Sequence, residues 1–259
     1  MFVKKGFTFL LCLFFFGLTF AIGSNIKASP SKDRFHYEET GEIMWEIKTK
    51  EKVVALTFDD GPHKKYTAEI LDVLQKYNAK ATFFIVGENA EKNPELILRQ
   101  YNEGHEIANH TYTHPQSLKT TLPQLELELK QTDDLIFSIT GYYPELFRPV
   151  EGQYTDQMIQ NISNKGYQVV MWSWHQDTED WRSPGVHRIE KKVLDGVEPG
   201  NIILFHDGGG NRSQTVKALD NIMEKLEKQG YKFVTVSDLI KIKKAEENLK
   251  PDIPMLESR

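Results

Sequence analysis

The chain has 259 residues, of which 39% are hydrophobic and 27% are charged, so its composition excludes a disordered polymer. This length suits one globular domain of the larger kind, such as an α/β barrel. The formal net charge of −5 argues against nucleic acid as a partner.

In chain order, the first feature is residues 1–28. Lys4 and Lys5 precede residues 7–22, a run without any charge, and small residues follow around Ala28. This pattern predicts a secretory signal peptide that is cleaved after Ala28. An uncleaved membrane anchor is the alternative, although the apolar run is shorter than the ~20 residues of a spanning helix. We therefore expect a secreted or cell-surface protein.

Removal of residues 1–28 has two consequences for the mature chain. It takes away three lysines and no acidic residue, which moves the formal net charge from −5 to −8. It also removes Cys12, the only cysteine, so the mature protein is expected to have no disulfide. An exported protein of this kind relies on its core or on a metal for stability.

The rest of the chain divides into three segments. Residues 29–50 are predicted to form a polar, irregular arm with Trp45 and Ile47 as docking points, and residues 242–259 a charged, solvated tail. Between them, residues 51–241 alternate between strand and helix patterns, which predicts a single α/β domain with a parallel sheet. Strands are expected at 53–58, 81–86, 106–108, up to 147, 168–174, 201–205 and 232–236. Helices are expected at 67–77, 94–102, 122–139, 154–165, 189–194 and 216–228.

Polar, titratable residues follow the predicted strands at their C-terminal ends. Parallel strands that close into a barrel carry their active sites at these ends. A polar residue at the end of one strand is common by chance, but polar residues at the ends of several strands indicate that they form one active site. The residues concerned are Asp59, Asp60, Asn109, His110, Arg148, Asp177, Asp180, His206 and Asp207.

Two adjacent carboxylates, Asp59 and Asp60, lie in the segment 57–62 (TFDDGP). At a strand end, neighbouring side chains can point in different directions, so one can bind a metal while the other handles a proton. The alternative for this segment alone is a turn, because Asp, Gly and Pro are turn residues.

A pair of histidines, His110 and His114, lies in the segment 110–115 (HTYTHP). Histidines four residues apart are expected on one side of a helical turn, as two metal ligands require. Two surface histidines are the alternative. Together with Asp60 they make a two-histidine, one-carboxylate set that leaves positions open for water and substrate. Such a set suits catalytic zinc, cobalt or non-haem iron.

With three later segments, these two resemble the NodB-like polysaccharide deacetylases, also called carbohydrate esterase family four. The resemblance covers about residues 50–240 and follows the family's order of five motifs. The ordered set is far more specific than any single motif. The later three begin at Arg148-Pro149, at 177–181 (DTEDW) and at 204–207 (LFHD).

The resemblance implies a distorted (β/α) barrel of the NodB-homology type and a metal centre within it. Asp60, His110 and His114 would bind a divalent metal, with Zn²⁺ preferred and Co²⁺ or another divalent ion as the alternative. Asp59 would be the general base, and Arg148 would orient it. A surface salt bridge is the alternative for Arg148.

The same resemblance implies a general acid and a binding pocket for the acetyl group on the other side of the metal. His206 would be the general acid, tuned by Asp180. Trp181 and Leu204 would line the pocket for the acetyl methyl group, although a plain core position is the alternative for Trp181.

One departure from the family pattern follows Arg148. The family usually continues with a second proline, often an aromatic residue, and then glycine, whereas this chain has Val150, Glu151 and Gly152. A carboxylate at position 151 is expected at the rim of the sugar site, where it would affect the choice of substrate. The alternative is that this sequence change at the rim of the pocket has no functional effect.

The sequence therefore predicts a metal-dependent hydrolase that removes N-acetyl groups from an amino-sugar polymer by cleaving linear amide bonds. Peptidoglycan is the preferred substrate, because an exported enzyme meets the cell wall first, and chitin oligomers or O-acetylated xylan are alternatives. A glycan-binding protein that has lost catalysis and an iron-dependent oxygenase are two further classes. The first is disfavoured because the set Asp59, Asp60, His110, His114 and His206 is intact. The second is disfavoured because an oxygenase does not need Asp59 and His206 beside the metal. We expect a monomer whose partner is an acetylated glycan, without a stable protein partner.

Overall fold

The computed structural model describes residues 32–248, so the expected signal peptide and Cys12 lie outside the described residues. Its strands are β1 (Ile43–Met44), β2 (Val53–Asp59), β3 (Thr82–Ile85), β4 (Glu106–Asn109), β5 (Leu146–Phe147), β6 (Gln168–Val170), β7 (Ile202–His206) and β8 (Lys232–Val234). Its α-helices are α1 (Arg34–Thr40), α2 (Tyr66–Lys76), α3 (Gly87–Lys92), α4 (Pro94–Asn102), α5 (Leu122–Thr140), α6 (Asp156–Asn164), α7 (Val186–Leu194), α8 (Ser213–Lys228) and α9 (Val236–Asn248). No helix between residues 32 and 248 combines the length and hydrophobicity that a membrane span needs.

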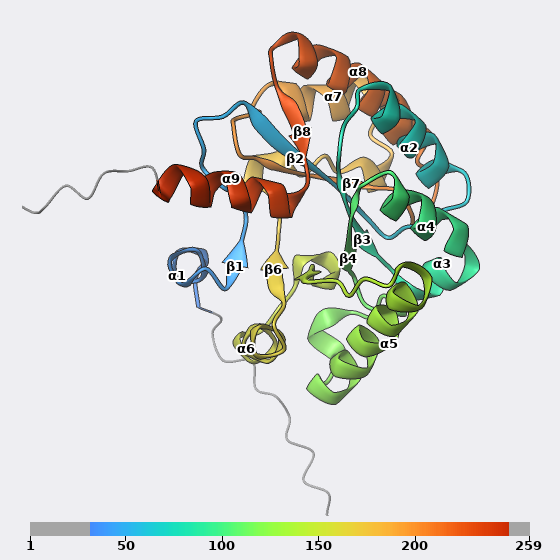
Figure 1. The fold of residues 1–259 in the computed structure, drawn as a ribbon, viewed down its shortest axis with the longest axis vertical. Helices are drawn as coiled ribbons and strands as arrows, with labels where there is room; N and C mark the ends of the chain where they lie inside the picture. Colours follow the sequence, from blue (N-terminus) through green and yellow to red (C-terminus); the bar gives the residue numbers. More distant parts are fainter. Residues whose placement is uncertain (1–31, 249–259) are drawn as a thin grey trace, which may run out of the picture.

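All the strand ladders are parallel, in the order β1-β6-β5-β4-β3-β2-β7, and β8 pairs with the first half of β2. The helices surround the strands, with α1, α6 and α5 around one part of the sheet and α2, α4, α7 and α8 around the rest (Figure 1). At the two ends of the sheet, the segment after β1 meets the segment before β7 through an isolated bridge between Glu46 and Asn201. The Ile47 N–H also donates to the Gly200 carbonyl there, at 3.0 Å. The predicted parallel α/β barrel is thus confirmed as a distorted half-barrel.

Strand β2 shows how the sequence creates an inside and an outside. Alternate residues of a strand face opposite sides of the sheet. Val54 and Phe58 pack against the outer helices, whereas Val53 and Ala55 belong to the interior cluster. Asp59 faces the same side as Val53 and Ala55, at the C-terminal end of the strand, beyond the apolar residues of the interior cluster. The interior side of β2 therefore changes from apolar to charged at the C-terminal end of the strand.

Helix α9 closes the interior at the other end. Its residues Val236 and Leu239 are fully buried in the interior cluster, and Ile242 packs against the same cluster. The helix continues to Asn248, so the first part of the expected solvated tail, residues 242–248, is helical. Residues 249–259 lie outside the described residues.

Two sequence-based expectations need correction. The arm at residues 29–50 is not irregular: it contains α1 and β1, and β1 pairs with β6. A two-residue strand is too short to show an alternating pattern, although Trp45 and Ile47 are buried as expected. The strand expected at 168–174 ends at Val170, because the chain then crosses towards β7, where the Ser173 N–H donates to the Ile202 carbonyl at 2.9 Å.

Replacing Leu239 tests whether α9 closes the barrel. Leu239→Ala should lower the free energy of unfolding by about 2–5 kcal/mol, because it leaves a cavity among fully buried side chains. Lys244→Ala, on the exposed side of the same helix, is the control and should change it by less than about 0.5 kcal/mol. Urea unfolding followed by circular dichroism measures both. Equal, small effects would mean that α9 is peripheral to the fold.

Candidate active site

A buried ion pair lies at the C-terminal end of the sheet. Asp59 ends β2, and Arg148 directly follows β5, whose partner strand β4 brings it towards the same end of the barrel. Arg148 Nη1 donates to Asp59 Oδ1 at 2.6 Å, and the Arg148 side chain is fully buried. Burial lowers the pKa of Arg148, and the Asp59 carboxylate opposes that shift. The other contacts of the guanidinium are with Thr57 Oγ1 (3.0 Å), Val170 O (3.0 Å) and Met171 O (2.8 Å).

Asp60, His110 and His114 come together beside this pair. One ligand atom from each lies within 4.8 Å of the other two. His114 Nε2 lies 3.1 Å and His110 Nε2 3.6 Å from Asp60 Oδ1. Asp60 has a positive φ of 73°, which turns its side chain away from that of Asp59. The set matches the donors of catalytic divalent-metal sites.

The ring nitrogens of His110 support this assignment. Its Nδ1 lies 2.7 Å from the Arg148 carbonyl oxygen, which can only accept, so Nδ1 carries the proton and donates. The lone pair is then on Nε2, which faces Asp60. A backbone carbonyl that fixes the tautomer in this way is the usual partner of a metal-ligating histidine.

The histidine loop does not form the expected helical turn. Residues 110–116 have no helical assignment, and Thr111 and His114 have positive φ angles of 70° and 56°. Glu128 of α5 holds the loop, because its carboxylate accepts from the N–H groups of Tyr112 (2.8 Å) and Thr113 (2.6 Å). The four-residue spacing therefore brings the two imidazoles together, but through a braced loop.

The charges of the trio depend on one another. Burial alone would raise the pKa of Asp60, but the hydrogen bond with His114 and the proximity of His110 hold it well below its usual range. Burial lowers the pKa of His110. For His114, burial acts in the same direction, but contact with Asp60 outweighs it and raises the pKa. The carboxylate is thus ionised, and the imidazole of the buried His110 is kept neutral, as a metal ligand must be.

His206 and Asp180 form a second buried pair. His206 ends β7 and is the register partner of Asp59 on β2. His206 Nδ1 lies 2.6 Å from Asp180 Oδ1, and the Asp180 Oδ2 accepts from the His206 N–H (3.0 Å) and from Thr215 Oγ1 (2.7 Å). Burial alone would lower the pKa of His206, but the charge of Asp180 raises it to about 9. The imidazole is therefore a proton donor at neutral pH.

These groups line one cavity of about 470 Å³. Of the ten site residues expected from the sequence, Arg148 and Asp180 lie behind the wall, and the other eight line the cavity. Leu204 is buried in that wall, whereas Trp181 is 49% exposed and so is not a core residue. The lining comprises Asp59, Asp60, His110, His114, Glu151, Gly152, Trp172, Asp177, Trp181, Leu204, His206, Gly209 and Arg212.

Glu151 lies at the rim of the cavity with an exposed side chain. Its φ of 56° is positive, and its charge contributes to the raised pKa of His114. The following Gly152 also has a positive φ, and a Cβ there would lie 2.7 Å from the Trp172 ring. The glycine that this chain shares with the family pattern is thus required by the close approach of the indole.

Sequence reasoning missed several residues at this site. Trp172 was expected inside a strand, and Arg212 was not singled out, although it follows the run of glycines at 208–210 that comes after the fifth motif. Asp207 was noted at a strand end without a role. It is fully buried under Gly61, and burial raises its pKa to about 7. A glycine run directly after a catalytic motif was the available signal.

The chain is similar to proteins of one family. Residues 46–170 match the family model described as polysaccharide deacetylase. A peptidoglycan-N-acetylglucosamine deacetylase of Bacillus cereus (strain ATCC 14579) is 44% identical over 210 residues, which cover 81% of this chain and 98% of that protein. The peptidoglycan-N-acetylmuramic acid deacetylase PdaC of Bacillus subtilis (strain 168) is 37% identical over 201 residues, which cover 78% of this chain and 41% of that one.

A solved structure shows the same relationship. The crystal structure of the Bc1960 peptidoglycan N-acetylglucosamine deacetylase, in complex with a naphthalenyl N-hydroxybenzamide, matches with a TM-score of 0.76 at 36% sequence identity. The match covers 79% of this chain and 95% of that one. The five ordered motifs, the parallel half-barrel and these relatives lead to one conclusion: the chain belongs to the NodB-like polysaccharide deacetylases, carbohydrate esterase family four.

Proposed function

We propose that this protein is an exported, metal-dependent deacetylase that hydrolyses N-acetyl groups of peptidoglycan. One observation carries the proposal. Asp59, held by the buried Arg148, and His206, held by the buried Asp180, line the same cavity as the three side chains proposed to bind the metal. Amide hydrolysis needs a base for the attacking water and an acid for the departing amine, and these two residues would supply them.

Asp60, His110 and His114 would hold the metal, and Zn²⁺ fits two imidazoles and one carboxylate best. When bound, a divalent cation polarises the acetamide carbonyl and lowers the pKa of its water from 15.7 to about 7. The Arg148 carbonyl keeps His110 in the required tautomer. The same arginine thus supports a metal ligand through its backbone and a carboxylate through its side chain.

Asp59 would accept the proton of the attacking water. Arg148 holds Oδ1 of this carboxylate, while Oδ2 lies 3.9 Å from His110 Nε2 and so faces the metal position. A base must be fixed within hydrogen-bond reach of the proton that it takes. The buried guanidinium fixes the carboxylate through Oδ1 and leaves Oδ2 to accept the proton.

His206 would protonate the departing amine. Asp180 keeps the imidazole charged at neutral pH and aims it by bonding to Nδ1, which leaves Nε2 to donate. The backbone N–H of Glu151 is our candidate for holding the developing oxyanion. Leu204 and Trp181 would hold the acetyl methyl, because apolar walls with a few convergent polar groups are typical of ligand pockets.

Peptidoglycan is the proposed polymer for two reasons. The relatives named above are peptidoglycan deacetylases, and one of them matches almost over its whole length. The N-terminal 28 residues have the pattern of a secretory signal, which would place the enzyme at the cell wall, by cleavage or as an anchor. Chitin oligomers and acetylated xylan are the substrates against which this choice must be tested.

The decisive experiment measures acetate released by the metal-loaded protein and by Asp59→Asn. The wild type should release acetate from peptidoglycan faster than from chitin oligomers or acetylated xylan. Asp59→Asn should keep its metal, measured by mass spectrometry, and lose about 10²–10⁴-fold in kcat, because a positioned base contributes that much. His114→Ala should lose the metal and the activity together.

Other outcomes would change specific parts of the proposal. No acetate from any glycan would remove the enzymatic function and leave a glycan-binding protein. Loss of metal in Asp59→Asn but not in Asp60→Asn would reverse the roles of the two carboxylates.

Asp180→Asn should move the alkaline limb of the pH profile of kcat to lower pH. The Asp180 carboxylate raises the pKa of His206, so the acid stays protonated until the pH approaches about 9. Without that charge the pKa falls, and the protonated form is lost at lower pH. Thr215→Val is the control, because it removes a hydrogen bond to Asp180 but no charge. A lower kcat with an unmoved limb would make Asp180 purely structural.

A further inference from the structure

A second cavity of about 350 Å³ adjoins the active site. Gly209 lines both cavities, and Asp60 separates them. The Asp60 side chain faces the metal position, while its carbonyl oxygen accepts from Asn89 Nδ2 (2.8 Å) on the other side. We call this second space the lysine cavity. It is lined by Pro62, His63, Lys64, Asn89, Lys92, Asn93, Gly208 and Gly209.

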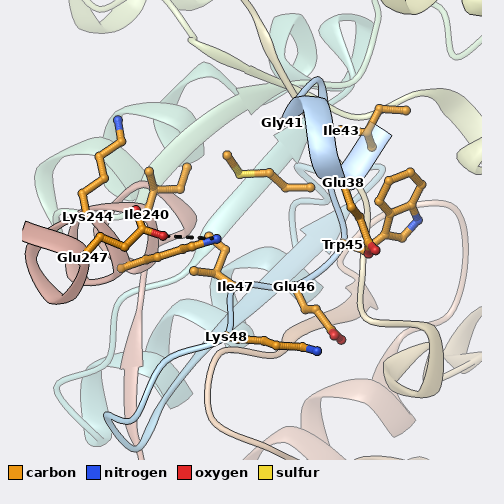
Figure 2. Close-up of a pocket in the computed structure, with 12 residues that line it drawn as sticks. Glu38, Gly41, Ile43, Trp45, Glu46, Ile47, Lys48, Ile240, Lys244 and Glu247 are labelled. Carbon is orange, nitrogen blue, oxygen red and sulfur yellow. Dashed lines mark ion pairs between the residues drawn. The ribbon is translucent and has the colours of Figure 1, made fainter. Parts of the chain in front are cut away.

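The lysine cavity is positively charged in an acidic protein. Two lysines line it, and none of its lining residues is acidic. Lys64 forms no ion pair within the part of the chain that the structure describes, and Lys92 has only a long contact, 3.8 Å, with the exposed Glu88. The cavity between the N-terminal arm and α9 is different, because lysines and glutamates balance there (Figure 2). Its charged lining residues are Glu38, Glu46, Glu247, Lys48, Lys243 and Lys244.

His63 adds a hydrogen-bond donor to this cavity. Its Nδ1 accepts from the N–H groups of Lys65 (3.2 Å) and Tyr66 (3.3 Å). An imidazole nitrogen that accepts carries no proton, so the ring proton lies on Nε2. The ring therefore offers an N–H group in addition to the two ammonium groups.

Arg212 places a third positive charge at the boundary of the two cavities. It is 3% exposed, and it donates to the carbonyls of Gly208 (2.7 Å) and Gly209 (3.1 Å). Between residues 32 and 248 it forms no ion pair with a carboxylate, although buried charges are usually paired. Arg212 lines the active-site cavity, and a Cβ at the shared Gly209 would lie 3.2 Å from Arg212 Nη2 and 2.7 Å from Asp60 Oδ2. Arg212 thus adds a positive charge at the boundary, next to the carboxylate of Asp60.

We infer that the lysine cavity is a subsite for a carboxylate carried by the amino sugar that presents the reacting acetamide. This inference rests on the proposed function and names the substrate class more closely. N-acetylmuramic acid carries a lactyl ether on the ring carbon next to its acetamido carbon. Its carboxylate, or the carboxylates of a peptide attached there, would lie only a few bonds from the reacting amide. Neutral chitin oligomers and xylan lack such a group.

The test compares three acetylated substrates: peptide-free glycan strands with free lactyl carboxylates, strands with attached peptides, and neutral chitin oligomers. The variant is Lys64→Ala/Lys92→Ala, whose changes are at exposed residues. The control Lys48→Ala/Lys192→Ala makes the same change in net charge at exposed lysines outside both cavities. The metal-loaded proteins are assayed for acetate release at low and high salt.

The subsite requires a selective effect. Lys64→Ala/Lys92→Ala should lower kcat/KM for the carboxylate-bearing strands by about 3- to 10-fold at low salt, mainly through KM. The value for chitin oligomers and all values for the control should change less than twofold. High salt should abolish the difference between wild type and variant, because it screens exposed charges. The strand with the larger effect identifies the lactyl or the peptide carboxylate as the ligand.

Two results would overturn the inference. One is an equal loss on charged and neutral substrates, which would mean that the lysines only support the active-site loop. The other is no change on any substrate. If the wild type releases no acetate at all, the proposed function fails, but the subsite is still tested by binding. The peptide-free strand should then bind more weakly to Lys64→Ala/Lys92→Ala than to the control, and equal affinities would reject the subsite.

Discussion

The site depends on one buried ion pair, between Arg148 and Asp59. The guanidinium is fully buried, its N–H groups contact two backbone carbonyls and a threonine as well as the carboxylate, and it lies 3.9 Å from the centre of the Phe84 ring. Burying two charges is costly, and removing one partner leaves the other uncompensated. The pair therefore ties β2 to β5 and β6, and it fixes one oxygen of Asp59. Because the Arg148 carbonyl also holds His110, the proposed base and a proposed metal ligand are placed relative to the same residue.

The fixed position of Asp59 is consistent with the two different roles proposed for the adjacent carboxylates. Asp59 continues the inward-facing series of β2, whereas Asp60 has a positive φ and turns towards the two histidines. A non-glycine residue in this region stores strain, which the surrounding contacts must offset. At Asp60 these contacts are the hydrogen bond from Asn89 and the close approach of Gly208, where a Cβ would lie 2.0 Å from the Asp60 carbonyl oxygen. The strained residue is thus the one whose side chain must point away from that of its neighbour Asp59.

The sequence predicted the parallel α/β fold, because apolar runs separated by amphipathic segments leave few other arrangements. Strand ends alone predicted that Asp59, His110 and His206 would meet at one end of the sheet, since parallel strands bring their C-terminal residues together there. The complete set of ten site residues came from the resemblance to the family. The sequence did not predict the loop at His110, because positive φ angles at Thr111 and His114 depend on Glu128 of a distant helix. Nor did it identify Arg212, whose hydrogen-bond partners are the carbonyls of Gly208 and Gly209, so that the glycine run before it was the one available signal. The short elements of the arm, α1 and β1, were missed because they acquire order from packing against α6 and β6.

The most direct test of this account is a double-mutant cycle between Arg148→Met and Asp59→Asn, measured as free energies of unfolding of the metal-loaded protein. Arg148→Met alone should cost about 3–5 kcal/mol, because it leaves a buried carboxylate without a partner. The double variant should be less destabilised than the sum of the single variants, with a coupling of up to about 3 kcal/mol. Additive effects within about 0.5 kcal/mol would mean that the two residues act independently and would contradict the claim that this pair organises the site.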